Sequence, residues 1–139
     1  MQKSFVKEFK LYCKKKNLDV NSHQIKLIKT LEEYYKLNYK SFISKILSKK
    51  NYKKGVYLYG DVGVGKTMIL DFVFNLVEGK KIKLHFNEFM LSFHNFVHQS
   101  KGKNDENKIS KFVKKLKSKA KLIYFDEFQV TNIVDAMIL

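Results

Sequence analysis

The hydrophobic positions of this 139-residue chain follow two spacings. Apolar side chains recur every three or four residues in several segments, which predicts amphipathic helices over residues 3–16, 23–37, 42–47, 87–99 and 109–116. The apolar residues 68–74 suit the start of another helix. Short apolar runs predict strands at residues 56–59, 82–86 and 122–126. Continuous apolar strands are typical of a buried parallel sheet, so the pattern favours an α/β protein.

The strand predicted over residues 56–59 runs directly into a glycine-rich turn. Residues 60–67 read Gly-Asp-Val-Gly-Val-Gly-Lys-Thr and match G-x-x-x-x-G-K-[ST], the phosphate-binding P-loop. Glycine lets the backbone approach a phosphate closely, and the helix that follows points its unpaired N–H groups and positive dipole end at the anion. The strand–loop–helix context favours a real site over the alternative, a glycine-rich turn with a stray lysine.

This loop supplies the residues predicted to bind ATP and Mg²⁺. The nucleotide-binding candidates are Gly60, Asp61, Val62, Gly63, Val64, Gly65, Lys66, Thr67 and Met68. We expect Lys66 to serve catalysis by placing a mobile positive charge at the β- and γ-phosphates. The Thr67 hydroxyl is the first candidate ligand of Mg²⁺.

A second apolar strand, at residues 122–126, ends in two adjacent carboxylates, Asp126 and Glu127. This is the form of a Walker B element. Because ligands of parallel sheets bind at the carboxyl ends of the strands, we expect these carboxylates near the end of the P-loop strand. Asp126 can hold Mg²⁺, and Glu127 is placed to polarise the attacking water as general base. An acidic strand end is weak evidence by itself, since such acids are often only solvated, but a preceding P-loop strengthens it.

The chain carries a formal net charge of +15, and all 28 of its basic residues are lysine. Such a charge favours partners that carry phosphates, either nucleic acid or anionic lipid. The lysines lie in nearly every segment, however, which indicates a compositional bias on solvated faces. The absence of arginine argues against bidentate recognition of phosphates or base edges, so we do not expect nucleic acid to be a partner.

The remaining candidate chemistry is sparse. Cys13 is the only cysteine, so neither a disulfide framework nor a cysteine-based metal site is expected. His94 and His98 lie four residues apart but lack the Glu of H-E-x-x-H, so we expect surface or partly buried histidines instead of metal ligands. No signal-peptide core and no apolar run of membrane-spanning length is visible, which favours a cytoplasmic location.

Three segments of the chain resemble the ZapE-type ATPases, the bacterial division-associated ATPases with mitochondrial relatives known as ATPase family gene one-like proteins. The segments are residues 55–71, 85–90 and 125–139. Val64, Asn87 and Asn132 depart from the family's usual residues. The resemblance implies an AAA+-like fold and Mg-ATP hydrolysis. For bacterial members it also implies protein partners in the division machinery, and for mitochondrial members a role in protein quality control.

From these features we expect an α/β P-loop NTPase of the AAA+-like type, with a parallel sheet and a helical N-terminal lead-in. The lead-in covers residues 1–53 and the ATPase core residues 54–139. A homo-oligomer is the alternative to division partners. A bacterial cytoplasmic location, with peripheral association at the inner membrane as its variant, is preferred over a mitochondrial one.

The resemblance further implies at least two more strands, an arginine finger and a helical lid. One of those strands, the sensor strand, would lie between the P-loop and Walker B strands, so its absence would leave a gap in the sheet. We therefore interpret the chain as truncated after Walker B, with weak or no turnover alone. Two alternatives stay open: a nucleotide-binding interaction module without turnover, and a helicase-loader-like ATPase, which only the charge of +15 supports.

Overall fold

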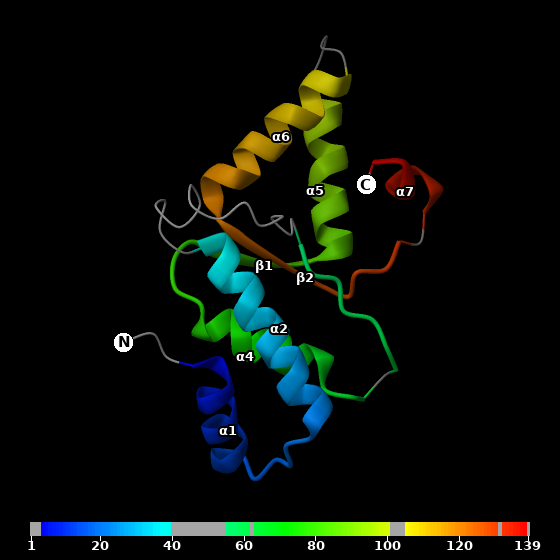
Figure 1. Ribbon diagram of the computed structural model, residues 1–139. Coiled ribbons are helices and arrows are strands. Elements are labelled where there is room, and N and C mark those ends of the chain that lie inside the picture. The colour runs from blue at the N-terminus through cyan, green and yellow to red at the C-terminus, as the bar shows by residue number, and fades with distance from the viewer. Residues whose placement is uncertain (1–3, 40–54, 62, 101–104, 131, 139) are drawn as a thin grey trace. The chain divides into compact units, whose positions relative to one another are not determined.

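The computed structural model of the protein describes residues 4–39, 55–61, 63–100, 105–130 and 132–138. Figure 1 shows the elements of these residues in chain order: α1 (Phe5–Lys15), α2 (Ser22–Tyr39), α4 (Lys66–Leu76), β1 (Lys81–His85), α5 (Phe86–Gln99), α6 (Asp105–Lys119), β2 (Leu122–Asp126) and α7 (Ile133–Ile138). The chain divides into two compact units, the first unit at Met1–Val77 and the second unit at Glu78–Leu139.

The first unit is a cluster of helices built around α4, the helix that follows the P-loop. Helices α1 and α2 contact each other, and both contact α4. The buried apolar side chains are spaced at helical intervals on all three helices: Phe5, Phe9, Cys13, Ile28, Leu31, Ile69 and Val73. Helices α1 and α2 thus pack on the helix that follows the P-loop.

The segment before the P-loop differs from the prediction of a short buried strand at residues 56–59. Residues 55–61 form no hydrogen-bonded ladder with any described residue. Tyr57 and Tyr59 are 65% and 85% exposed, and their rings stack at a centroid distance of 6.4 Å. A strand needs hydrogen bonds from a neighbouring strand to satisfy its backbone, and the sheet in the described part of the chain consists of β1 and β2 alone. The predicted strand is thus wrong for this structure.

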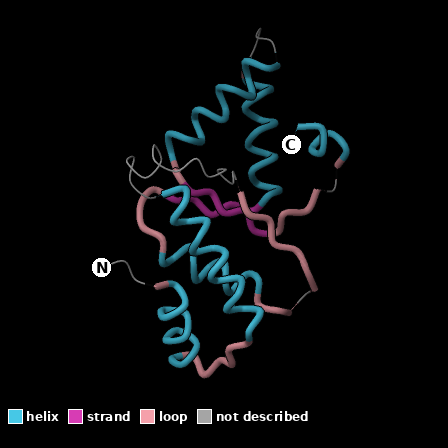
Figure 2. The backbone as a smooth tube through the Cα atoms, in the orientation of Figure 1, coloured by secondary structure: helices cyan, strands magenta, loops and turns pink. Residues whose placement is uncertain are grey.

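The second unit is a two-stranded parallel sheet covered by α5 and α6. Figure 2 shows the two strands in magenta, and they pair in register from Lys81 opposite Leu122 to His85 opposite Asp126. Helices α5 and α6 connect them, which is the crossover that parallel strands require. The core of this unit is aromatic and consists of Phe86, Met90, Phe93 and Phe112, with Phe89, Phe96, Phe125 and Phe128 packed against it.

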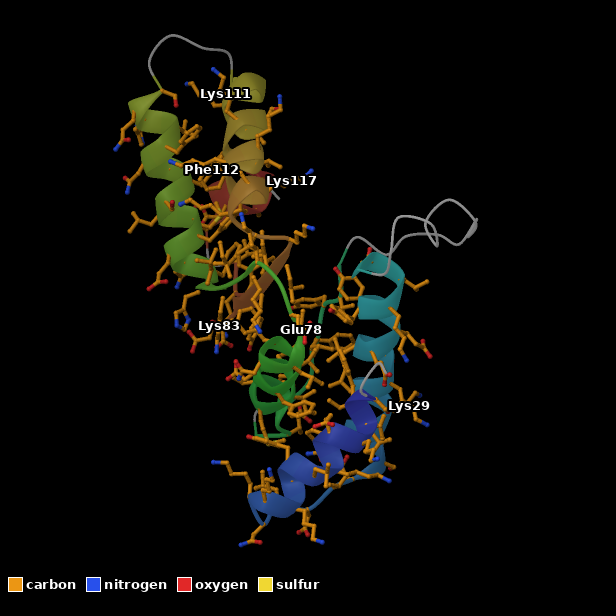
Figure 3. The ribbon with its side chains drawn as sticks, turned by 90° about the vertical axis from the view of Figure 1, so that its left-hand side faces the viewer. Lys29, Glu78, Lys83, Lys111, Phe112 and Lys117 are labelled. Carbon is orange, nitrogen blue, oxygen red and sulfur yellow. The ribbon has the colours of Figure 1, made fainter. Side chains whose placement is uncertain are left out.

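Figure 3 shows Phe112 between α5 and α6, where its ring lies edge-on to Phe93 at 5.2 Å. Lys111 and Lys117 lie on the exposed side of α6. The spacing of Ile109, Phe112, Val113 and Leu116 predicts a helix here, and α6 covers all four. Phe112 is buried as an apolar side predicts, but Ile109 and Val113 are 40% and 38% exposed.

The other predicted elements agree with the structure to within a few residues. The strand at residues 122–126 has the predicted bounds, whereas the strand predicted at 82–86 lies one residue earlier because Phe86 begins α5. The segment 42–47 and the proposed boundary at residue 53 lie outside the described residues. Among the described helices none is both long enough and apolar enough to cross a membrane.

Candidate functional site

The phosphate loop of the first unit has the backbone that its glycines predict. Gly60, Gly63 and Gly65 have φ angles of 142°, 85° and 86°, a region that residues with a Cβ atom rarely adopt. Gly65 is in the left-handed conformation and directly precedes α4. The loop therefore reverses direction through glycines and leads straight into the N-terminus of a helix.

The start of α4 offers backbone donors to an anion. The first helical hydrogen bond runs from the Ile69 N–H to the Gly65 carbonyl oxygen, at 3.0 Å. The N–H groups of Lys66, Thr67 and Met68 precede it, so they lie where a helix presents its unpaired donors and positive dipole end. The Thr67 side chain is exposed at the same helix end.

Lys66 turns back over the loop that it follows. Its Nζ donates hydrogen bonds to the carbonyl oxygens of Gly60 at 2.8 Å and Asp61 at 2.5 Å. The ammonium group is thus held at the beginning of the loop while its backbone lies at the end. Val64 is 52% exposed on this loop. Val62 lies outside the described residues.

The second group of predicted site residues lies at the carboxyl ends of β1 and β2. Asp126 Oδ2 lies 3.1 Å from Lys83 Nζ, and Lys83 also lies over the Tyr124 ring, 5.0 Å from its centroid. The pKa of Asp126 is lowered overall. Burial alone would raise it, but the hydrogen bond and charge of Lys83 outweigh burial, and the Tyr124 hydroxyl and the Glu127 backbone add smaller contributions in the same direction as Lys83. Asp126 is therefore held as a carboxylate.

Glu127 has an unusual backbone for its residue type. Its φ angle is 51°, in the left-handed region, and its carbonyl oxygen accepts a hydrogen bond of 2.7 Å from the Gln129 N–H. The Glu127 side chain is 76% exposed, and its Oε2 lies 4.0 Å from His85 Nδ1. Positive φ at a non-glycine residue is strained and is found preferentially at functional sites, where surrounding structure maintains it.

The structure therefore brings the predicted residues together in two groups. The described loop residues, Gly60, Asp61 and Gly63 to Met68, lie together in the first unit, and Asp126 lies beside Glu127 in the second. The expected proximity of the carboxylates to the P-loop stays a prediction.

Lys83 and His85 were missed as neighbours of the acidic pair. Lys83 and His85 are two residues apart on β1, so their side chains lie on the same face of the sheet. This spacing identifies them as neighbours of Asp126 and Glu127 only when the register between β1 and β2 is known.

The histidines of α5 have no sign of a metal-binding role. His94 Nε2 lies 2.9 Å from Asp135 Oδ1 of α7, and the His98 side chain is exposed. No cluster of three or more His, Cys, Asp or Glu side chains occurs in the described ranges of the chain. That result is compatible with Mg²⁺, which proteins usually bind through one or two carboxylates together with water and substrate phosphates.

Comparison with known proteins gives the family. The sequence profile of the AFG1-like ATPases matches residues 10–139. The chain belongs to the AFG1-like ATPase family. This agrees with the resemblance to ZapE-type ATPases and with an α/β P-loop fold.

Several relatives of this AFG1-like chain are known by sequence. It is 40% identical over 102 residues to Lactation elevated protein 1 homolog B of Danio rerio, covering 66% of this chain and 20% of the relative. It is 37% identical over 87 residues to Cell division protein ZapE of Escherichia coli K12, covering 62% of this chain and 23% of the relative. The matched regions thus span about a fifth of the length of these relatives. No solved structure gives a significant match.

Proposed function

We propose that this AFG1-like chain binds Mg-ATP and carries the P-loop and Walker B residues of an ATP-hydrolysing enzyme. The observation that carries the proposal is the phosphate loop. Three glycines with positive φ lead into the N-terminus of α4, and the Lys66 ammonium already lies across the loop on two carbonyl oxygens. Such an arrangement provides backbone donors at a helix N-terminus and one mobile cation on the same loop, which is what a phosphate requires.

The chain's own residues have distinct tasks in this proposal. Lys66 exchanges its two carbonyl acceptors for the β- and γ-phosphate oxygens. Thr67 and Asp126 offer the oxygen ligands that Mg²⁺ prefers. Mg²⁺, when bound, would neutralise part of the phosphate charge. Glu127, exposed and next to Asp126, orients the attacking water and accepts its proton.

The biological role is proposed from the relatives' names. Cell division protein ZapE supports a role in bacterial division, with division proteins or further copies of the chain as partners. We place such a protein in the cytoplasm, with peripheral association at the inner membrane as a variant. Because the 139 residues contain no arginine, an arginine finger at the γ-phosphate would come from outside them.

Calorimetry with Mg-ATP tests the binding step. The wild-type chain should bind, and Lys66→Ala should weaken binding roughly 10- to 100-fold because charge-assisted hydrogen bonds are lost. Lys29→Ala, an exposed lysine of α2 in the same unit, is the matched control and should bind as wild type does. Equal affinity in Lys66→Ala and Lys29→Ala would refute the assignment of the loop.

A turnover assay separates the proposal from a second candidate, a nucleotide-binding module without hydrolysis. The absence of arginine from these 139 residues, and with it of an arginine finger, favours that second candidate. Phosphate release that disappears in Glu127→Gln while ATP binding persists would support hydrolysis with Glu127 as base. Tight ATP binding without phosphate release would support the module instead.

A further inference from the structure

A cavity of about 310 Å³ lies in the first unit directly beside the phosphate loop. Its lining comes from the start of α2, from residues 58–59 and from the loop and α4. All three segments belong to the first unit. This volume is at the lower end of the range of roughly 300 to 1,000 Å³ that is usual for small-molecule sites. Of the predicted site residues Val64 and Lys66 line this cavity, whereas neither Thr67 nor Asp126, the predicted Mg²⁺ ligands, does.

Lys66 connects the cavity with the phosphate loop. Its side chain lines the cavity, and its Nζ donates to two carbonyl oxygens of the loop. A ligand whose phosphates lay on the loop would therefore have this cavity next to it. In a nucleotide, the end away from the phosphates is the base.

The cavity combines apolar walls with a neutral polar edge. Leu27, Leu58 and Ile69 contribute aliphatic surface, and the amides of Asn21 and Gln24 lie at the start of α2. Lys66 lies on the phosphate side of the lining, and His23 stands between the two amides at the start of α2. Apolar walls and a few convergent neutral hydrogen-bonding groups are what a flat heteroaromatic ring requires.

Gln24 is held in place by a reciprocal helix cap. The Gln24 N–H donates to Asn21 Oδ1 at 2.8 Å, and the Asn21 N–H donates to Gln24 Oε1 at 3.3 Å. This capping box begins α2 and fixes the direction of the Gln24 amide. The Nε2 atom then lies 3.5 Å from the position that a Cβ atom of Gly65 would occupy. Among the described residues Nε2 donates no hydrogen bond, so a donor stands unused beside the phosphate loop.

We infer that this cavity holds the base of the bound nucleotide and that Gln24, oriented by Asn21, reads the edge of an adenine. The inference rests on the proposed function, because it places the base from the position of the phosphates. Gln24 Nε2 donates to the purine N7, and the second lone pair of Oε1 accepts from the 6-amino group. Glutamine makes this bidentate pair with adenine N7 and N6. Guanine presents a carbonyl oxygen where adenine presents the amino group, so the Gln24 oxygen would face another acceptor.

Calorimetric affinities for ATP, GTP and tripolyphosphate, each with Mg²⁺, test the inference on the 139-residue chain. Wild type should prefer ATP to GTP by roughly 5- to 100-fold, the usual range for a bidentate base contact. Gln24→Met keeps the length of the side chain but removes the amide, so it should lose this preference and bind ATP more weakly. Its affinity for tripolyphosphate should stay at the wild-type value. Gln99→Met, an exposed glutamine at the end of α5, is the matched control and should change none of the three.

Gln24→Glu gives a second variant that retains the helix cap, because Glu at this position still accepts from the Asn21 N–H. It replaces the amide donor by an acceptor, so its ATP affinity should fall more than its tripolyphosphate affinity. An ATP preference that persists in both variants would overturn the base site and leave the phosphate loop standing. A wild-type chain that binds neither ATP nor tripolyphosphate would overturn the proposed function together with the base site.

Discussion

Phe9 ties the helical lead-in to the helix that follows the P-loop, and its replacement should loosen the whole first unit. The Phe9 side chain is 0% exposed, and its ring lies edge-on to Phe72 of α4 at a centroid distance of 5.2 Å. Phe9→Ala removes this ring and leaves a cavity, which costs about 3 to 5 kcal/mol in typical cores. Domains have about 0.05 to 0.15 kcal/mol of stability per residue, which is roughly 4 to 12 kcal/mol for a unit of this size. The substitution should therefore remove at least a quarter of that stability.

Cys13 provides an assay that reports on this unit alone. It is the only thiol in the chain, its side chain is fully buried on α1, and burial raises its pKa. A thiol reagent can therefore react only after the unit opens, and the labelling rate follows the opening equilibrium. A loss of 3 to 5 kcal/mol should accelerate labelling of Cys13 roughly 150- to 5,000-fold.

Two further variants test whether faster labelling of Cys13 reflects the loss of packing between α1 and α4. Leu11→Ala changes a side chain of the same helix that is 46% exposed, and it should alter the labelling rate about twofold at most. Phe72→Ala should accelerate labelling from the other helix, and the double variant with Phe9→Ala should show a coupling of about 0.5 to 1.5 kcal/mol. If Phe9→Ala labelled no faster than Leu11→Ala, or if the coupling were zero, the packing of α1 on α4 would be refuted.

Three other outcomes follow from the backbone and from burial. Burial raises the pKa of the Cys13 thiol, so the folded state favours the protonated form. The resulting stabilisation of the folded state is fully present below pH 9.0, the ordinary thiol pKa, and is lost as the pH rises above it. Urea unfolding at increasing pH should therefore lose more stability in wild type than in Cys13→Ala. Gly65→Ala places a side chain at φ 86° and should cost about 1 to 2 kcal/mol, with weaker tripolyphosphate binding by calorimetry. Glu127→Gly should stabilise the second unit by about 1 kcal/mol in hydrogen exchange while abolishing any hydrolysis, whereas Asn17→Gly, at the same φ of 51°, should gain less because Asn tolerates this region.

The predictions that succeeded rest on local signals. The strand at residues 122–126 is a continuous apolar run, and the P-loop requires glycine where φ is positive, so short stretches of sequence were sufficient. The failed strand at residues 56–59 has an equally apolar sequence, but whether a strand forms depends on a hydrogen-bonding neighbour that the segment itself does not encode. Helix α7 has six residues, too few for a periodic pattern.

The site residues show the same division between local and long-range information. Asp126 and Glu127 could be proposed from their position after a strand, but the neighbours Lys83 and His85 depend on the register between β1 and β2. Gln24 could be recognised as a helix-capping residue from its spacing to Asn21. Its place beside Gly65 depends on how α2 packs against α4, which no local pattern contains.

In each unit a lysine is paired with groups that a nucleotide complex would engage. Lys66 donates to the loop carbonyls of Gly60 and Asp61, and Lys83 pairs with Asp126 at 3.1 Å. Both sets of contacts can be replaced at low cost. The partly exposed Lys83–Asp126 ion pair is worth only about 1 kcal/mol or less, and the carbonyl oxygens that Lys66 contacts are weaker acceptors than phosphate oxygens. In the proposed Mg-ATP complex, phosphate oxygens and a divalent cation would replace these partners at little cost in free energy. The affinity for the nucleotide would then be set by the new contacts and not by the cost of breaking the old ones.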